Sequence, residues 1–287
     1  MGSIGIYNCT VGGTINTINV NGAVCGGYGA SAPVTVIGLD HSDLILQGKT
    51  SSNLIAYTSA TNNLDYSDAK EYYAVKNPDG TWSAVSHEEA AEYVAEVDGI
   101  VYKSLPEAVS AVITSPSKTG TVTLLKDCKG SGIGLFNGNG HVDVNLTIDF
   151  GGHTYTLSGE SVGSTGTESQ GFHFEKNNTV TLKNGNVQVA ESASNFKMLV
   201  QNYCDLTLKD ISLAGNSSTQ YIISVNYGDV TLDNVNIYSP SNNFVAIDLM
   251  HWINASYKDK APTMVINNGT NNHINGNIDV YCDPDTD

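Results

Sequence analysis

The chain contains no arginine: all 13 basic residues are lysine, against 29 acidic residues, and the net charge is −16. Nucleic-acid binding requires a basic surface, usually rich in arginine, so this class of protein is excluded. The forked recognition of carboxylates and phosphates by guanidinium groups is missing as well. No apolar run approaches the ~18 residues of a membrane-spanning helix, so we expect no membrane insertion.

Cysteine is scarce and scattered. No CxxC motif occurs, and no histidine lies at zinc-ligand spacing from a cysteine, so we predict neither a metal site nor a cofactor. We interpret the five cysteines as small apolar side chains: Cys9, Cys25, Cys128, Cys204 and Cys282. The opening Met1-Gly2-Ser3 resembles an expression tag, and no secretory signal follows it, so we expect an excerpt from a longer protein.

A triplet of the form apolar–Thr–apolar repeats along the chain from residue 122 onward. It begins at residues 122, 146, 180, 206 and 230, and a degenerate copy begins at 264, so the intervals are 24, 34, 26, 24 and 34 residues. Each triplet is followed by polar turn residues and a second alternating strand. Units of ~24 residues are too short for a βαβ crossover. We therefore predict an all-β fold, a parallel β-helix solenoid in which each coil stacks ~4.8 Å above the last.

Equivalent positions of neighbouring units form columns in this prediction. Leu182, Leu208 and Leu232 stack inside, and Thr181, Thr207 and Thr231 point outward. Three polar columns complete the pattern. They are Asn184, Asp210 and Asn234 after the first strand, Asn202 and Asn226 (each followed by a tyrosine) before it, and Asp149, Lys183, Lys209 and Asp233 on the outer face. The charges in the last column pair Asp149 with Lys183 and Lys209 with Asp233.

The predicted solenoid begins with a cap. Residues 95–102 form a hairpin on an Asp-Gly turn, and Ser104 is the N-cap of a helix that continues to about Ile113. We expect three segments: closing coils of a preceding β-helix in residues 1–58, a junction with a hairpin and a short helix (about 88–95) in 59–94, and the capped β-helix in 95–287.

Four stretches carry a resemblance to a known family. They are residues 76–82 (KNPDGTW), 101–108 (VYKSLPEA), 120–125 (GTVTLL) and 146–155 (LTIDFGGHTY). Over roughly residues 70–270 the chain resembles the right-handed parallel β-helix (pectin-lyase-like) repeat proteins on the surfaces of gut-type anaerobic bacteria. The resemblance implies a non-enzymatic, adhesin-like module of a large secreted or cell-surface protein. Its implied partners are a host glycoprotein, an immunoglobulin or a glycan, with further β-helix modules in the same chain.

Enzymes of this fold cleave polysaccharides, so a carbohydrate-active enzyme is the alternative. Pectate-lyase-like members would have an acidic calcium cluster beside a basic residue, usually arginine, which this chain lacks. Asp205 and Asp229 occupy equivalent outward positions in adjacent coils and form the best catalytic pair, with stacked corner residues as the structural interpretation. His173 and Glu175 alternate outward, and we interpret them as a solvated face.

The two 34-residue intervals each hold an excursion of about ten residues. The first, residues 158–167, is rich in Gly, Ser and Thr, and the second is residues 251–260. Insertions in a solenoid form surface loops, where function tends to reside. The second excursion has a composition suited to an interface or to sugar stacking, although Trp252 has an alternative interpretation as the cover of a coil corner. The candidate binding residues are Trp252, Tyr257, Lys258, Lys260, Tyr203 and Tyr227.

Overall fold

The computed structural model describes residues 87–238, 244–253, 256–267 and 269–281, together with five earlier strands. These are β1 (Ile18–Asn21), β2 (Leu44–Gln47), β3 (Ala56–Thr58), β4 (Lys70–Lys76) and β5 (Trp82–Ser86). Contacts divide the chain into one unit of residues 1–93 with 98–101 and a second of 94–97 with 102–287. The boundaries at 58 and 94 stay predictions, and most of the coils expected in residues 1–58 lie outside the described residues.

In the first unit, β1 pairs in parallel with β2, and β4 pairs antiparallel with both β3 and β5. The pairing of Lys76 with Trp82 closes the hairpin expected around the Asn-Pro-Asp-Gly sequence. The short helix that follows is α1 (His87–Ala90). The helix predicted to reach residue 95 is therefore wrong in length. The backbone N–H of Val94 instead donates to the carbonyl of Tyr102 (2.8 Å), and Ala95 begins a strand.

The next elements along the chain are β6 (Ala95–Val97), β7 (Ile100–Tyr102) and α2 (Leu105–Thr114). Asp98 and Gly99 have φ values of 51° and 79°, the left-handed backbone of a tight hairpin turn. Ser104 is the N-cap of α2, and its hydroxyl accepts the N–H of Glu107 (3.3 Å). Both features were expected from the sequence, because Asp-Gly and Ser-x-x-Glu meet specific backbone requirements.

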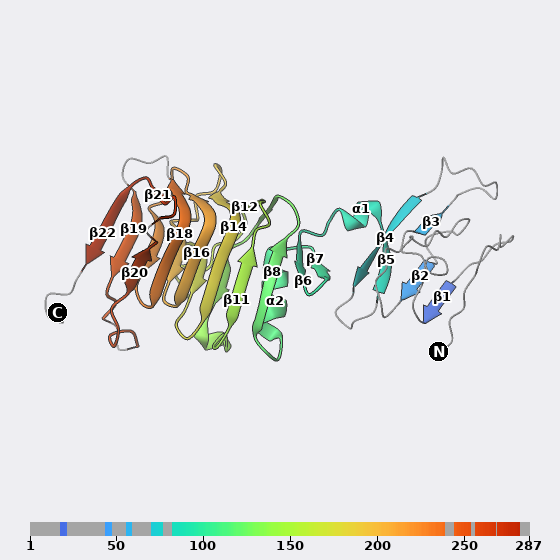
Figure 1. Cartoon of the computed structure of the whole chain (residues 1–287), viewed down its shortest axis with the longest axis horizontal. Coiled ribbons are helices and arrows are strands. Elements are labelled where there is room, and N and C mark those ends of the chain that lie inside the picture. The colour runs from blue at the N-terminus through green and yellow to red at the C-terminus, as the bar shows by residue number, and fades with distance from the viewer. Residues whose placement is uncertain are drawn as a thin grey trace. The chain divides into compact units, whose positions relative to one another are not determined.

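The remainder of the second unit is mostly β, in parallel sheets. One sheet has the order β10-β13-β15-β17-β19-β22, and the other contains β20-β18-β16-β14-β11-β8, in which β8 also pairs antiparallel with β6. Figure 1 shows β8, β11, β14, β16 and β18 side by side. The chain alternates between the sheets, since β13, β15, β17 and β19 belong to one and the intervening β14, β16 and β18 to the other.

The bounds of these elements follow chain order. They are β8 (Thr119–Leu124), β9 (Cys128–Gly130), β10 (Ile133–Leu135), the 3₁₀ helix η3 (Asn137–Asn139), β11 (Asn145–Asp149), β12 (Thr154–Leu157), β13 (Gln170–Phe174), β14 (Thr179–Val189), β15 (Met198–Asn202), β16 (Asp205–Ala214), β17 (Tyr221–Val225), β18 (Asp229–Tyr238), β19 (Val245–Met250), β20 (Thr263–Ile266), β21 (His273–Ile274) and β22 (Asn277–Tyr281).

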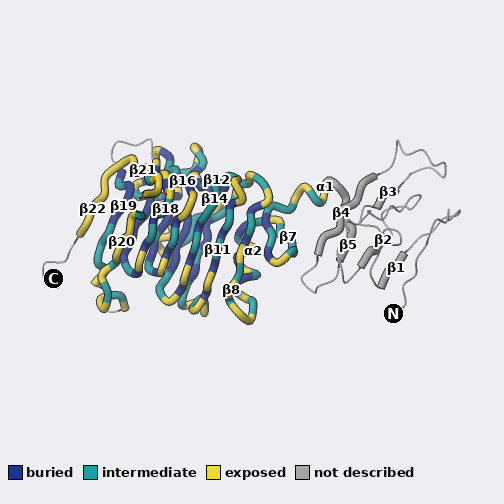
Figure 2. Tube along the Cα trace, in the orientation of Figure 1, coloured by how far each residue is buried: buried dark blue, intermediate teal, exposed yellow. Residues whose placement is uncertain are grey.

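The core lies between the two sheets and contains the predicted apolar columns. Leu182 pairs with Leu208, and Leu208 with Leu232, in continuous parallel register, and all three are fully buried. Figure 2 shows buried segments repeating from strand to strand across this unit. Outward residues hold the same register, since Lys183 contacts Asp149 (3.2 Å) and Lys209 contacts Asp233 (3.4 Å).

Three long strands bend at one position each. Asn184, Asp210 and Asn234 have φ values of 58°, 50° and 57°, in the left-handed region that Asn and Asp tolerate better than other non-glycine residues. The amide of Asn234 donates to Asp210 Oδ1 (2.8 Å), and the amide of Asn184 donates to Asp149 (3.0 and 3.1 Å). The predicted polar column after the first strand is therefore the line along which β14, β16 and β18 bend.

The column predicted for Asn202 and Asn226 is wrong by one residue. In the sheet of β15 and β17, Met198 pairs with Tyr221 and Asn202 with Val225. This offset is 23 residues, whereas the other sheet pairs Leu206 with Val230, an offset of 24. Because of this shift, the two side chains have different partners. The amide of Asn202 donates to the carbonyl of Cys204 (2.7 Å), while Asn226 Oδ1 accepts the Ser224 hydroxyl (3.0 Å).

Candidate functional site

Five rings contact one another along one side of the second unit, and we call them the aromatic row. The ring centroids are 5.0 Å apart for Phe136–His173, 5.6 Å for His173–Tyr203, 4.8 Å for Tyr203–Tyr257 and 5.6 Å for Tyr257–Tyr227. Phe136, His173 and Tyr203 lie on or directly after β10, β13 and β15, whose parallel pairing brings them together. The contacts are tilted, stacked and edge-on, within the separations favoured for aromatic pairs.

Tyr257 reaches the row from the second excursion, the loop of residues 251–260, of which 254 and 255 are not described. Its ring lies between Tyr203 and Tyr227, which do not align directly because of the one-residue register shift. The ammonium of Lys176 lies 5.3 Å from the Tyr257 centroid and 5.8 Å from the Tyr227 centroid. These are cation–π distances. The lysine therefore contacts both the loop, through Tyr257, and the turn after β17 that carries Tyr227.

Polar contacts fix the same loop at four further points. Lys176 Nζ donates to the carbonyl of Ser256 (2.5 Å), and the Tyr227 hydroxyl donates to Asp259 (3.3 Å). The backbone N–H of Trp252 donates to the carbonyl of Asn226 (3.3 Å), and Lys260 forms an ion pair with Asp229 (2.8 Å). Each contact is weak by itself, but together they hold both ends of the loop against the sheets.

The loop exposes large apolar side chains although it is held in place. Trp252 is 38% exposed and its neighbour Ile253 is 54% exposed. Lys258 is also exposed, whereas Lys260 is half-buried and paired. Exposed tryptophan on an ordered backbone is typical of interface anchors, because little conformational entropy is lost when it is buried. The predicted binding residues thus divide into exposed ones (Trp252, Lys258) and ones that support the loop (Tyr203, Tyr227, Tyr257, Lys260).

Asp205 and Asp229 do lie together, as equivalent outward positions require. Asp205 Oδ1 accepts the backbone N–H of Asp229 (3.3 Å). The carboxylate of Asp229 accepts hydrogen bonds from Lys260 Nζ (2.8 Å) and Thr263 Oγ1 (2.5 Å), and these bonds lower its pKa. A general acid requires the opposite shift, so this environment stabilises the ionised carboxylate rather than a proton donor. The catalytic role of the pair stays an untested prediction.

The interpretation of His173 as part of a solvated face is wrong. Its side chain is only 3% exposed, because Phe136 and Tyr203 lie against its ring. Burial lowers the pKa of His173 to about 4, so the imidazole is neutral at pH 7, and its Nδ1 makes no hydrogen bond. Glu175 instead accepts the backbone N–H of Asn137 (2.6 Å). His173 is therefore buried between aromatic rings, whereas Glu175 accepts a backbone hydrogen bond.

The aromatic row also contains residues that sequence reasoning missed. Phe136 and Lys176 carry no motif, and only the packing of neighbouring strands brings Phe136 to His173 and Lys176 to the 251–260 loop. Ile253, next to Trp252, was a signal in the sequence because two consecutive apolar residues in a polar loop are unusual. Burial raises the pKa of Tyr203 to about 12, so its phenol stays protonated and accepts the Gln201 amide (3.0 Å).

No group of three or more His, Cys, Asp or Glu side chains able to hold a metal ion occurs among the described residues. None of the helices in the described part of the chain is long and apolar enough to cross a bilayer. Cys128 and Cys204 are free thiols, and Cys204 is buried. No protein-family model, curated protein or solved structure matches this chain, so its function must be argued from the site alone.

Proposed function

We propose that the chain is a non-enzymatic binding module of a large secreted or cell-surface bacterial protein of the adhesin type. Its partner is a host glycoprotein, an immunoglobulin or a glycan. Its fold is a right-handed parallel β-helix, a single solenoid of ~24-residue coils. Support for the solenoid comes from the alternation of the chain between two parallel sheets in register. The left-handed bend at the same position of three successive strands also supports it.

One observation carries the binding proposal: the 251–260 loop is fixed by the aromatic row and by polar contacts while it exposes Trp252 and Ile253. Two adjacent exposed apolar side chains on a fixed loop offer apolar surface that a partner can bury. A fixed loop binds with a smaller entropy cost than a mobile one. The exposed Lys258 adds a donor on the same loop. The absence of arginine and the net charge of −16 disfavour polyanionic partners.

The test is capture from mucosal secretions with the whole chain as bait, followed by affinity measurement on the captured partner. Trp252→Ala removes the central exposed ring, and we expect at least a tenfold loss of affinity, as for an interface anchor. Tyr238→Ala is the matched control, because Tyr238 is an exposed aromatic residue (49%) on β18 outside the loop. Unchanged binding by Trp252→Ala, or an equal loss with Tyr238→Ala, would remove the loop from the proposal. Circular dichroism of each variant confirms that the fold is retained.

A further inference from the structure

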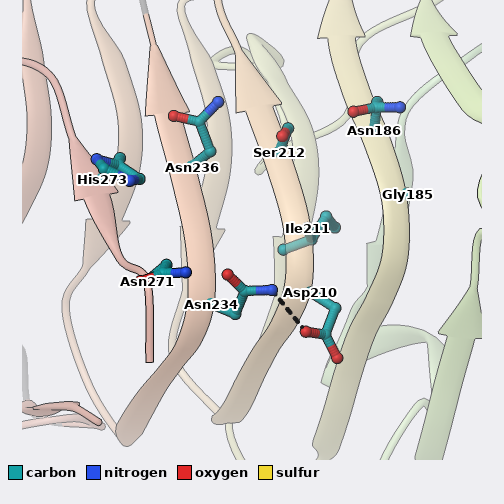
Figure 3. Close-up of a pocket in the computed structure, with 9 residues that line it drawn as sticks. All are labelled: Gly185, Asn186, Asp210, Ile211, Ser212, Asn234, Asn236, Asn271 and His273. Carbon is teal, nitrogen blue, oxygen red and sulfur yellow. Dashed lines mark hydrogen bonds between the residues drawn. The ribbon is translucent and has the colours of Figure 1, made fainter. Parts of the chain in front are cut away.

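A polar groove lies along the line where β14, β16 and β18 bend, and Figure 3 shows its lining. Its volume is about 450 Å³, within the ~300–1,000 Å³ of small-molecule sites. Asn186, Ser212 and Asn236 occupy the same outward position on β14, β16 and β18, and His273 continues this column on β21. Asp210 and Asn234, joined by their hydrogen bond, form a second column beside the first.

The groove exists because the last turn is longer than those before it. Leu232 pairs with Ile266, and Asn236 pairs with His273. The segment from Ile266 to His273 is therefore three residues longer than the segment from Leu232 to Asn236 that it lies against. This longer turn forms a wall that carries Asn271. Thr270 Oγ1 accepts the N–H of Asn234 (3.3 Å), and Asn272 Oδ1 accepts the N–H of Val235 (2.9 Å). Side chains therefore replace the backbone pairing that the extra residues disrupt, and they hold the wall against β18.

The chemistry of the lining points to a ligand with many hydroxyl groups. The side chains of Ser212, Asn236, Asn271 and His273 make no hydrogen bond to another described residue, so their side-chain donors and acceptors are free for a ligand. Primary amides and a hydroxyl both donate and accept, which matches the dual capacity of sugar hydroxyls. Neighbouring members of a column are separated by the ~4.8 Å between adjacent strands. Among the described lining residues, Ile211 has the one apolar side chain, and it is buried.

Charge narrows the ligand class further. No lysine is among the described residues that line the groove, and the one carboxylate among them, Asp210, already accepts the amide of Asn234. An acidic sugar would meet this carboxylate with no lysine to compensate, whereas a neutral sugar would meet mainly amides and the Ser212 hydroxyl. We propose that this groove binds a neutral oligosaccharide, separately from the surface around Trp252.

The experiment titrates the ¹⁵N-labelled full chain with three neutral probes, maltotriose, cellotriose and triacetylchitotriose, and with the acidic probe trigalacturonic acid. Because the groove is open to solvent, we expect at least one neutral probe to bind with a dissociation constant of millimolar order. The expected chemical-shift changes centre on the amides of Asn186, Ser212 and Asn236. We expect trigalacturonic acid to bind at least tenfold more weakly.

Two variants tie the binding to the groove. Ser212→Phe fills the groove from an outward strand position, and we expect it to weaken the neutral probe at least tenfold. Gln188→Phe is the matched control, since Gln188 is an exposed outward residue on β14 outside the groove, and we expect unchanged binding. Trp252→Ala also leaves this binding unchanged, so failure of the loop and failure of the groove are distinguishable. No shift with any neutral probe, equal binding by the two Phe variants, or equal binding of the acidic probe overturns the proposal.

Discussion

Replacing Leu208 with alanine tests whether the predicted inner column carries the stability of the second unit. Leu208 is fully buried on β16 and lies in register between Leu182 on β14 and Leu232 on β18. The substitution removes three carbon atoms from the middle of a stack whose members are positioned by backbone ladders on both sides. Because these ladders restrict collapse of the neighbouring side chains, we expect most of the cavity to remain.

Leu→Ala substitutions in packed cores cost about 2–5 kcal/mol, and the upper part of the range applies where the site cannot collapse. We therefore expect a loss of about 3–5 kcal/mol in the free energy of unfolding. Thr207→Ala is the matched control. Thr207 is the preceding residue, only partly buried on the outward face, so its loss should stay within about 1 kcal/mol, the span of β-propensity scales.

Urea unfolding followed by far-UV circular dichroism measures both variants against the parent chain. Repeating structures can lose segments independently, so hydrogen exchange at the amides of β14, β16 and β18 should accompany the urea curves. A loss below about 1 kcal/mol for Leu208→Ala, or a loss equal to that of Thr207→Ala, would refute the assignment of this column to the core.

Three further changes test other parts of the structure. Asp210→Gly and Asp210→Val both lose the Asn234 hydrogen bond, but only valine must adopt the left-handed φ of 50° with a β-branched side chain. Urea unfolding should therefore show Asp210→Val to be about 1–2 kcal/mol less stable than Asp210→Gly. Equal stability of the two variants would contradict a strained bend at this position. In the folded chain the pKa of His173 is about 4, below the ordinary 6.5, so the unfolded chain binds a proton at this imidazole more readily. The free energy of unfolding therefore falls by roughly 3 kcal/mol as the pH drops from 6.5 to 4. His173→Phe should remove that part of the pH dependence in urea unfolding at pH 7.5 and 4.5, and an unchanged slope would show that the imidazole is not buried. Tyr257→Ala deletes the ring between Tyr203 and Tyr227. Limited proteolysis should therefore cut near residues 251–260 faster than in the parent chain, while the thermal midpoint changes little. Unchanged cleavage would show that the aromatic row does not fix the loop.

The sequence was sufficient for features that depend on residue type and spacing. From residue 146 onward the interval between the triplets predicted which apolar residues pair, and the outward ion pair of Lys183 with Asp149 followed from the same register. The first interval was wrong by two residues, because Val122 pairs with Ile148 and not with Leu146. The turn at Asp98-Gly99 and the N-cap at Ser104 could be predicted because each residue meets a specific backbone requirement. These features are local, or they repeat with the period of the chain.

Features that depend on packing across strands could not be predicted. Alternation correctly directed His173 away from the core, but its burial depends on Phe136 and Tyr203, which lie far from it in sequence. Equal spacing aligned Asn202 with Asn226, yet the two sheets repeat with different offsets because one turn is longer by a residue. The polar groove was missed for a similar reason, since its wall comes from a lengthened turn after a degenerate triplet.

The most direct test of the account is a methyl–methyl NOESY spectrum of the full chain with labelled leucine side chains. In-register stacking places Leu208 one strand away from both Leu182 and Leu232, at the ~4.8 Å of adjacent parallel strands. The account predicts strong cross-peaks from Leu208 to each of these residues and a much weaker one between Leu182 and Leu232. Absence of both Leu208 cross-peaks, or a Leu182–Leu232 cross-peak as strong as they are, would contradict it.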